Sequence, residues 1–234
     1  YGSQSNIARD VMEEVSVRSQ DHLKMLLLTG VVCNNATLAK VDQRVKLLGS
    51  PTEGALLTVA SKAGFDRDEL NSIWEREEEI PFSAEHKWMA VKCRNKTTNK
   101  RQYFVKGAPE NIIEKCVAYY RSNQETSVPL SRNDRLDIVN AANEFANNAL
   151  RVMALAYGDQ SDNNLTFVGL VGIYDPPREG VKDAIHKLID AGVKVVMITG
   201  DSKETAVAIG RELGIVTSEK SSIVEDSEIA LSVA

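Results

Sequence analysis

The sequence lacks the short motifs that assign the commonest nucleotide, hydrolase and metal sites. It contains no G-x-x-x-x-G-K-[ST] loop, no G-x-G-x-x-G fingerprint and no G-x-S-x-G elbow. Its three histidines are scattered along the chain, and none has the spacing of a metal-ligand set. These absences exclude a P-loop site, a nucleophile-elbow hydrolase and a histidine-based metal centre. Any nucleotide would have to be bound by a less common device.

Cysteine, long apolar runs and basic charge are also scarce. Cys33, Cys93 and Cys116 are an odd number at wide spacing, which fits neither a disulfide framework nor a zinc cluster and suits a reducing compartment. The longest apolar run, residues 25–33, is far below the roughly 18 residues of a membrane helix. With 28 basic and 33 acidic residues the net charge is −5. We therefore expect a soluble chain that does not bind nucleic acid.

The remaining composition is that of an ordinary globular protein. The chain has 234 residues, 43% of them apolar and 26% charged, which is enough for one large domain or one domain plus part of another. The first 20 residues are polar and weakly patterned, and they are expected to be a loose lead-in. Periodicity predicts the following elements: helices at 21–34, 51–63, from 109, and 131–150, and strands at 87–93, 101–106, 151–157 and 165–173. The polar loop 94–100 predicts that the first two strands form a hairpin.

The helix at 51–63 has the clearest start signal in the sequence. Ser50 is a good N-cap, Pro51 suits the first turn, and Glu53 completes an S-x-x-E capping box. Gly64 is a plausible stop. Capping is therefore a sufficient role for Glu53 on local pattern alone.

After residue 174 the pattern changes. Asp175-Pro176-Pro177-Arg178 cannot continue a central strand, because proline removes ladder donors, and it is a candidate hinge. A helix closed by Gly192 follows, then the apolar strand 193–198, the turn 199–201, and a helix at 203–213. Helix, buried strand, turn and helix is typical of a parallel α/β sheet. We therefore predict an α+β domain over residues 1–174 and a Rossmann-like piece over 175–234.

Two segments of the first region place a cation beside a feature that suits a ligand. Phe82 precedes Lys87 at the entry to a strand, so a ring could stack on a base while the ammonium meets a phosphate. The alternative is an edge strand with a solvated lysine. Lys106 and Gly107 end a strand just before a helix, where glycine permits close approach and the helix end favours an anion. The alternative is a simple strand-to-helix turn.

Two further candidates are weaker on pattern alone. Arg151 opens a strand, and its guanidinium suits a phosphate, although a surface ion pair is the plainer interpretation. Thr199, Gly200 and Asp201 follow the predicted buried strand, at the end where open α/β sheets bind ligands. The alternative there is a turn that caps the next helix.

Taken together and in order, these segments resemble the cytoplasmic part of P-type cation-transporting ATPases, specifically the calcium pumps. The resemblance covers residues 33–215 and is carried by GSPTEGAL at 49–56, PFS at 81–83, KGAPE at 106–110, RVMALA at 151–156, DPPR at 175–178 and MITGD at 197–201. Residues 82–91 and 200–209 are most similar to the secretory-pathway (Golgi) calcium/manganese pumps.

The resemblance implies two domains and one ATP site. Residues 1–174 would be the nucleotide-binding domain, an antiparallel sheet flanked by helices, and 175–234 part of a haloacid-dehalogenase-like phosphorylation domain, with the hinge at 175–178. Phe82 would stack on adenine near Glu53, and Lys87 and Lys106 would line the pocket. The remaining implied contacts are Gly107 to the approaching nucleotide, Arg151 to the phosphates, and Thr199, Gly200 and Asp201 to the γ-phosphate end after domain closure. Ala84 stands where some calcium pumps have an arginine.

Two family motifs are missing from the chain. Neither the phosphorylated Asp-Lys-Thr-Gly-Thr nor the later Mg²⁺-holding Gly-Asp-Gly-x-Asn-Asp occurs. The resemblance therefore implies a fragment that binds ATP with Mg²⁺ but has no nucleophile for phosphoryl transfer. Its partners would be the pump's membrane part, actuator domain and remaining phosphorylation domain, at the cytoplasmic side of an intracellular membrane, the Golgi being favoured.

Two alternatives stay open at this stage. A haloacid-dehalogenase-type phosphatase would use Thr199 as its phosphate-binding hydroxyl, but the nucleophilic aspartate motif of that fold is not present early in the chain. A non-catalytic interaction module would use Phe82 and Trp88 as a protein-binding patch.

Overall fold

The computed structural model describes residues 21–41, 44–121, 127–174, 177–178, 180–199 and 203–216. The predicted lead-in at residues 1–20 lies outside these ranges. The chain divides into two compact units, one formed by residues up to 136 together with 153–171, and one formed by 137–152 together with 172–234. Its helices are α2 (Asp21–Val32), α3 (Pro51–Lys62), α4 (Arg67–Ile73), α5 (Pro109–Lys115), α6 (Arg132–Asn147), α7 (Val181–Asp190) and α8 (Lys203–Glu212). None of the helices in the described part is both long and apolar enough to cross a bilayer.

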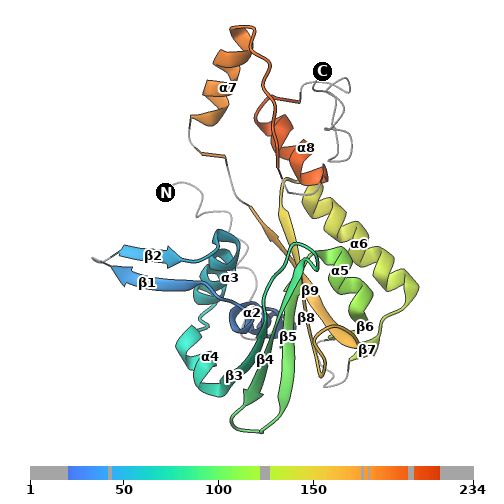
Figure 1. The fold of residues 1–234 in the computed structure, drawn as a ribbon. Coiled ribbons are helices and arrows are strands. Elements are labelled where there is room, and N and C mark those ends of the chain that lie inside the picture. Colours follow the sequence, from blue (N-terminus) through green and yellow to red (C-terminus); the bar gives the residue numbers. More distant parts are fainter. Residues whose placement is uncertain are drawn as a thin grey trace. The chain divides into compact units, whose positions relative to one another are not determined.

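A seven-stranded sheet is the largest element of the fold (Figure 1). Its strands lie in the order β3 (Trp74–Ile80), β4 (Trp88–Asn95), β5 (Arg101–Gly107), β8 (Arg151–Gly158), β9 (Leu165–Ile173), β6 (Cys116–Tyr119) and β7 (Val128–Pro129). A separate antiparallel hairpin pairs β1 (Thr37–Val41) with β2 (Arg44–Leu48). The prediction of an antiparallel sheet is wrong in one respect, because β6 runs parallel to β9. The sheet is mixed because α5 carries the chain over to a distant strand instead of folding it back as a hairpin.

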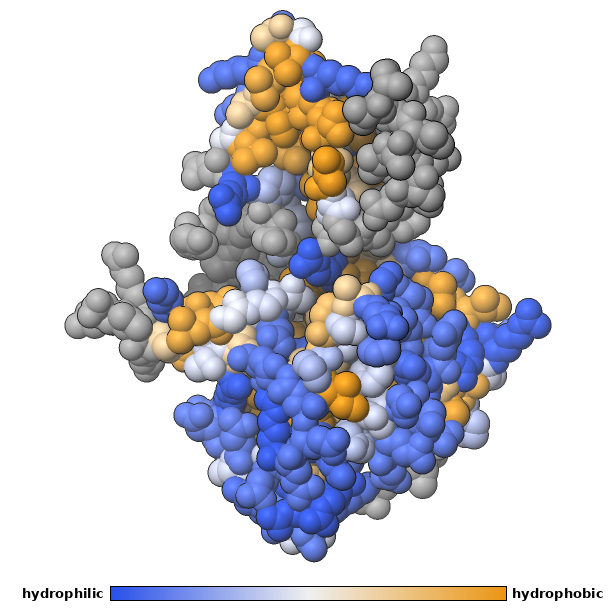
Figure 2. Space-filling model, in the orientation of Figure 1, coloured by the Kyte–Doolittle hydropathy of each residue, from blue (hydrophilic) through white to orange (hydrophobic). Residues whose placement is uncertain are grey.

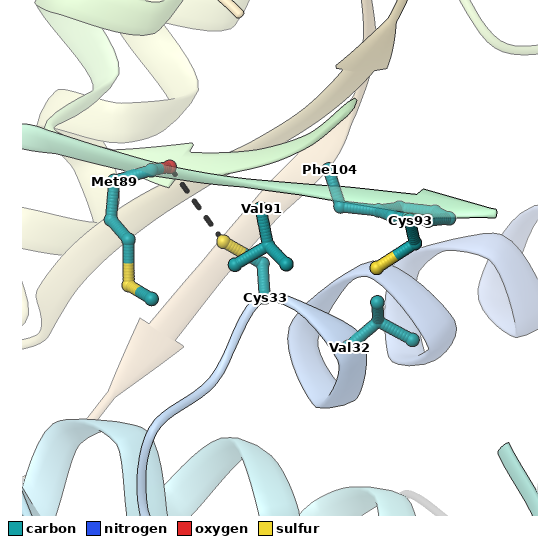
Figure 3. Close-up of a cluster of buried hydrophobic side chains, with 6 residues drawn as sticks. All are labelled: Val32, Cys33, Met89, Val91, Cys93 and Phe104. Carbon is teal, nitrogen blue, oxygen red and sulfur yellow. Dashed lines mark hydrogen bonds between the residues drawn. The ribbon is translucent and has the colours of Figure 1, made fainter. Parts of the chain in front are cut away.

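The predicted hairpin of β4 and β5 is confirmed and supplies one face of a core. The two strands pair antiparallel from Trp88 opposite Gly107 to Arg94 opposite Arg101. Alternate residues of β4 face one way and pack with Phe104 of β5 under the end of α2. Figure 3 shows this cluster, whose members are Val32, Cys33, Met89, Val91, Cys93 and Phe104. Because this core anchors the hairpin, the backbone at the end of the strands where Trp88 pairs with Gly107 is fixed.

A second core joins α2 to α3. Its buried members are Leu27, Val31, Ala36, Leu57 and Ala60. The predicted start and stop of α3 are both confirmed, since the helix begins at Pro51 and the chain turns at Gly64 with a φ of +81°. A glycine suits that left-handed conformation. The first turn of α3 is therefore fixed relative to α2 and to the loop that follows α2.

Several elements have too little local signal to be predicted, and β3 is the clearest case. Its sequence, WEREEEI, is rich in glutamate, which is uncommon in strands. Its side chains pair with cations of the neighbouring hairpin: Glu77 with Arg101 at 3.0 Å, and Glu75 with Arg94. These cross-strand pairs stabilise a strand whose own composition does not favour one. The other elements missed are β1, β2, α4, β6 and β7.

The second unit contains the predicted helices but not the predicted strand. The helices expected before Gly192 and after residue 202 are present as α7 and α8. Residues 193–198 form no strand, and Ile198 is 85% exposed. A strand requires a hydrogen-bonded neighbour, and no residue in the described ranges pairs with this segment. The predicted Rossmann-like sheet is therefore not shown by residues 180–199 and 203–216, and it stays a prediction.

Some large apolar residues of α6 and α7 are exposed. Leu136 and Val139 of α6 are exposed, although Ala142 and Ala146 of the same helix are buried. On α7 Ile185 is buried, while Leu188 and Ile189 are exposed. Figure 2 shows apolar residues gathered on the surface over α7 and the segment after it. An amphipathic pattern predicts an apolar face, but it does not supply the element that covers it.

Candidate functional site

Lys106 and Glu53 form a buried ion pair. Lys106 is next to the end of β5 and only 5% exposed, and its Nζ donates a hydrogen bond to Oε1 of Glu53, in the first turn of α3. The two side chains are 6% and 14% exposed. A buried charge needs a partner to offset its loss of hydration, and each of these residues supplies it to the other. Two residues predicted separately, 53 positions apart, therefore belong to one site.

The carboxylate of Glu53 does not form the predicted capping box. Ser50 is in the N-cap position with an extended backbone, but its side chain makes no capping hydrogen bond. Glu53 Oε1 instead accepts from Lys106 and from the main-chain N–H of Asn35 at 3.2 Å. The carboxylate is directed at β5 and the loop after α2 because the buried ammonium of Lys106 is a stronger donor than the main-chain N–H of the exposed Ser50, which a capping box would use.

Lys87 and Gly107 lie against each other at the start of β4. Gly107 pairs with Trp88, and the N–H of Ala108 donates to the carbonyl oxygen of Lys87 at 2.9 Å. A Cβ at position 107 would lie 2.6 Å from that same oxygen. Glycine is therefore required here by the packing of the two strands, and its predicted role in ligand approach remains a prediction. Lys87 itself is exposed and has a φ of +56°.

Phe82 is the exposed aromatic side chain of the loop that leads into β4. It is 62% exposed, which is unusual for a phenylalanine. The loop is held by a turn in which the N–H of Lys87 donates to the carbonyl of Ser83 at 2.8 Å. Trp88 is buried with the Lys115 ammonium 5.4 Å from its ring centre, so the suggested surface patch of Phe82 and Trp88 is wrong. Phe82 is therefore available for stacking, whereas the buried Trp88 ring is not.

The other predicted ligands belong to the second unit or lie outside the described ranges. Arg151 is the exposed first residue of β8, and Thr199 ends the segment after α7. Gly200 and Asp201 lie outside the described residues, as do Asp175 and Pro176 of the proposed hinge. The roles of these residues, and the domain division at 174/175, stay predictions.

A set of polar residues around Glu53 was missed by sequence reasoning. Asn35 donates through its side-chain nitrogen to Glu79 Oε1 and accepts from Arg76 Nη2, both at 2.7 Å. Asn34 donates to the carbonyl of Glu53 at 3.0 Å. The only signal for these residues is that they lie within the stretch of family resemblance, 33–215, which they share with most of the chain.

The cysteines do not provide nucleophiles or metal ligands. Burial raises the pKa of Cys33 to about 12, that of Cys93 to about 11 and that of Cys116 to about 12. All three are free thiols that stay protonated near neutral pH. Within the described ranges no group of three or more histidine, cysteine or acidic residues could hold a metal ion. The carboxylate of the site, Glu53, is paired with Lys106, so this part of the chain does not fit a resident Mg²⁺.

Comparison with known proteins identifies the family. Residues 22–180 match the family model described as P-type ATPase, cytoplasmic domain N. This match covers more than half of the chain and shows that the chain belongs to the P-type ATPase family. The family is the one predicted from the sequence, and the match favours it over the phosphatase alternative.

The relatives are calcium-transporting ATPases. The chain is 41% identical over 231 residues to calcium-transporting ATPase type 2C member 2 of Homo sapiens, covering 95% of this chain and 23% of the relative. It is 44% identical over 196 residues to type 2C member 1 of Bos taurus, covering 83% of this chain and 20% of the relative. A calcium-transporting ATPase of Bacillus subtilis is 39% identical over 215 residues, covering 87% and 24%. The chain thus spans about a fifth to a quarter of these relatives.

Proposed function

We propose that this chain is the ATP-binding cytoplasmic part of a calcium-transporting P-type ATPase. The observation that carries the proposal is the buried Lys106–Glu53 pair at the end of β5, next to the Lys87–Gly107 contact. Phe82 is exposed in the loop that leads to the same point. An accessible ring and an accessible ammonium beside a fixed charged pair suit a purine nucleotide, which needs stacking and charge neutralisation together.

The proposed roles follow from exposure and chemistry. Phe82 stacks on the adenine, and the exposed Lys87 ammonium meets the phosphates. Glu53 lies at the adenine edge, where its ion pair with Lys106 holds it. The contacts proposed for closure about residues 175–178 are those of Arg151, Thr199, Gly200 and Asp201 with the phosphates.

In the longer protein, the proposed reaction is phosphoryl transfer to an aspartate outside this chain. The aspartate oxygen forms a bond to the γ-phosphorus, the bond to the bridging oxygen of ADP breaks, and ADP leaves. Mg²⁺ bound with ATP would supply charge neutralisation, and its main ligands would lie outside this chain. The aspartyl-phosphate would drive transport of Ca²⁺ or Mn²⁺ across a secretory-pathway membrane, Golgi included, through the membrane, actuator and remaining phosphorylation parts.

Titration calorimetry of the chain with Mg·ATP tests the proposal. Phe82→Ala should weaken ATP binding about tenfold, because base–aromatic stacking contributes about 1–3 kcal/mol. Lys106→Ala should also weaken binding, because it releases Glu53. Leu48→Ala is a matched control, since Leu48 is also a large exposed apolar side chain but lies on the separate hairpin. Equal affinity in all variants would contradict the proposal, and phosphate release by the chain alone would favour a phosphatase.

A further inference from the structure

Three side chains form a closed polar cluster beside the proposed site. Asn35, Arg76 and Glu79, which we call the Asn35 cluster, each contact the other two. The Asn35 amide bonds both partners at 2.7 Å, and Arg76 Nη2 lies 2.8 Å from Glu79 Oε2. The side chains of Arg76 and Glu79 are about one-third exposed. A closed set of three partners fixes each rotamer more firmly than an isolated surface pair.

The cluster is connected to Glu53 through one peptide group. The carbonyl oxygen of Asn34 accepts from Arg67 Nη2 at 3.3 Å and from Arg76 Nη1 at 3.5 Å. The N–H of the same peptide group, which belongs to Asn35, donates to Glu53 Oε1 at 3.2 Å. Two guanidinium groups at the carbonyl polarise the peptide, which makes its N–H a stronger donor.

Glu53 is therefore held both at its main chain and at its carboxylate. Its main-chain carbonyl accepts from the side chain of Asn34 at 3.0 Å, and its carboxylate accepts from the N–H of Asn35. Lys106 contacts the same carboxylate oxygen. Because one oxygen serves both donors, a shift of the Asn35 peptide changes the direction in which Glu53 meets Lys106.

We propose that the Asn35 cluster is a positioning element for nucleotide binding, acting through the Glu53 carboxylate. The inference rests on the proposed ATP site and adds residues that touch no nucleotide in it. Arg76 and Glu79 set the Asn34–Asn35 peptide, and this peptide, together with Lys106, sets the Glu53 carboxylate. Loss of the cluster weakens ATP binding without removing a ligand contact.

A double-mutant cycle on the 234-residue chain tests this order of action. Arg76→Gln and Glu79→Gln should each raise the Kd for Mg·ATP roughly fivefold in the wild-type background, the effect of losing about one ordinary hydrogen bond. In a Glu53→Gln background the same changes should alter the Kd less than about twofold, since the residue through which they act is already changed. Arg101→Gln is the matched control, because Arg101 also pairs with a glutamate of β3, Glu77, but at the other end of β5. It should leave the Kd within about twofold of wild type.

The outcomes separate this inference from the proposed function. Weakening by Phe82→Ala with no weakening by Arg76→Gln or Glu79→Gln would overturn the inference alone. Equal weakening in both Glu53 backgrounds would also overturn it, because that result describes a loss of general stability. Absence of ATP binding by the wild-type chain would refute the proposed function and this inference with it. If Arg76→Gln does not fold by circular dichroism, the milder Glu79→Gln decides.

Discussion

Replacing Lys106 by methionine should destabilise the first unit more than the lost contacts of the ammonium alone would, because the buried carboxylate of Glu53 loses its cation. Methionine keeps the apolar stem but removes the ammonium, which leaves the 14% exposed Glu53 carboxylate with the Asn35 N–H as its remaining described donor. Breaking a buried pair by removing one partner costs about 3–5 kcal/mol. Because Glu53 keeps one donor and is still partly exposed, we expect the free energy of unfolding to fall by about 3 kcal/mol.

The assay is urea unfolding followed by tryptophan fluorescence. Trp74 and Trp88 both lie in the first unit, so the signal reports the unit that contains the pair. With an m-value of about 2–3 kcal/mol/M, the midpoint should fall by roughly 1 M or more. The double variant Lys106→Met with Glu53→Gln is the control, and it should recover most of that loss because no unpaired charge remains. A single variant as stable as wild type, or a double variant with the summed loss of both singles, would refute the argument.

Two other outcomes follow from contacts in the first unit. Gly107→Ala should lower the melting temperature by roughly 4–8 °C, because its Cβ would lie 2.6 Å from the carbonyl oxygen of Lys87. Gly30→Ala, whose Cβ would meet a Leu56 side chain at 3.5 Å, should not lower it, and equal losses would count against the packing argument. Burial raises the pKa of Cys33 from 9.0 to about 12, so the folded state keeps a proton that the unfolded state loses. Urea midpoints should therefore fall as pH rises from about 9 towards 12, less steeply in Cys33→Ala, and identical slopes would exclude the thiol as the cause.

Local signals were sufficient where an element carries its own start, stop or alternation. Pro51 and Gly64 bounded α3 correctly, and the β-rich segments on either side of a polar loop gave the hairpin of β4 and β5. The glutamates of β3 gave no such signal, because their pairing with Arg94 and Arg101 depends on strands that follow later in the chain. Residues 193–198 gave a misleading signal, since a run of apolar residues predicts a buried strand but a strand also needs neighbouring strands to pair with.

In the candidate site, too, local motifs indicated single residues but not the contacts between residues distant in the sequence. Glu53 and Lys106 were each proposed from their motifs, yet their contact joins residues 53 apart and could not be deduced from either motif. The capping-box pattern even favoured a different partner for Glu53. Asn35, Arg76 and Glu79 were missed because polar residues at such positions have many possible partners, and only the fold selects one.

Buried and exposed residues have different tasks in the proposed site. Lys106 and Glu53 neutralise each other, so their pair offers little net charge to an incoming triphosphate, and its contribution is the fixed position of one carboxylate. Attraction for the phosphates then depends on exposed cations, of which the proposal uses Lys87 and Arg151. Because exposed charges are screened by salt and by water, the proposed site predicts a modest ATP affinity for the chain alone, and tighter binding would require the additional phosphate contacts proposed for closure.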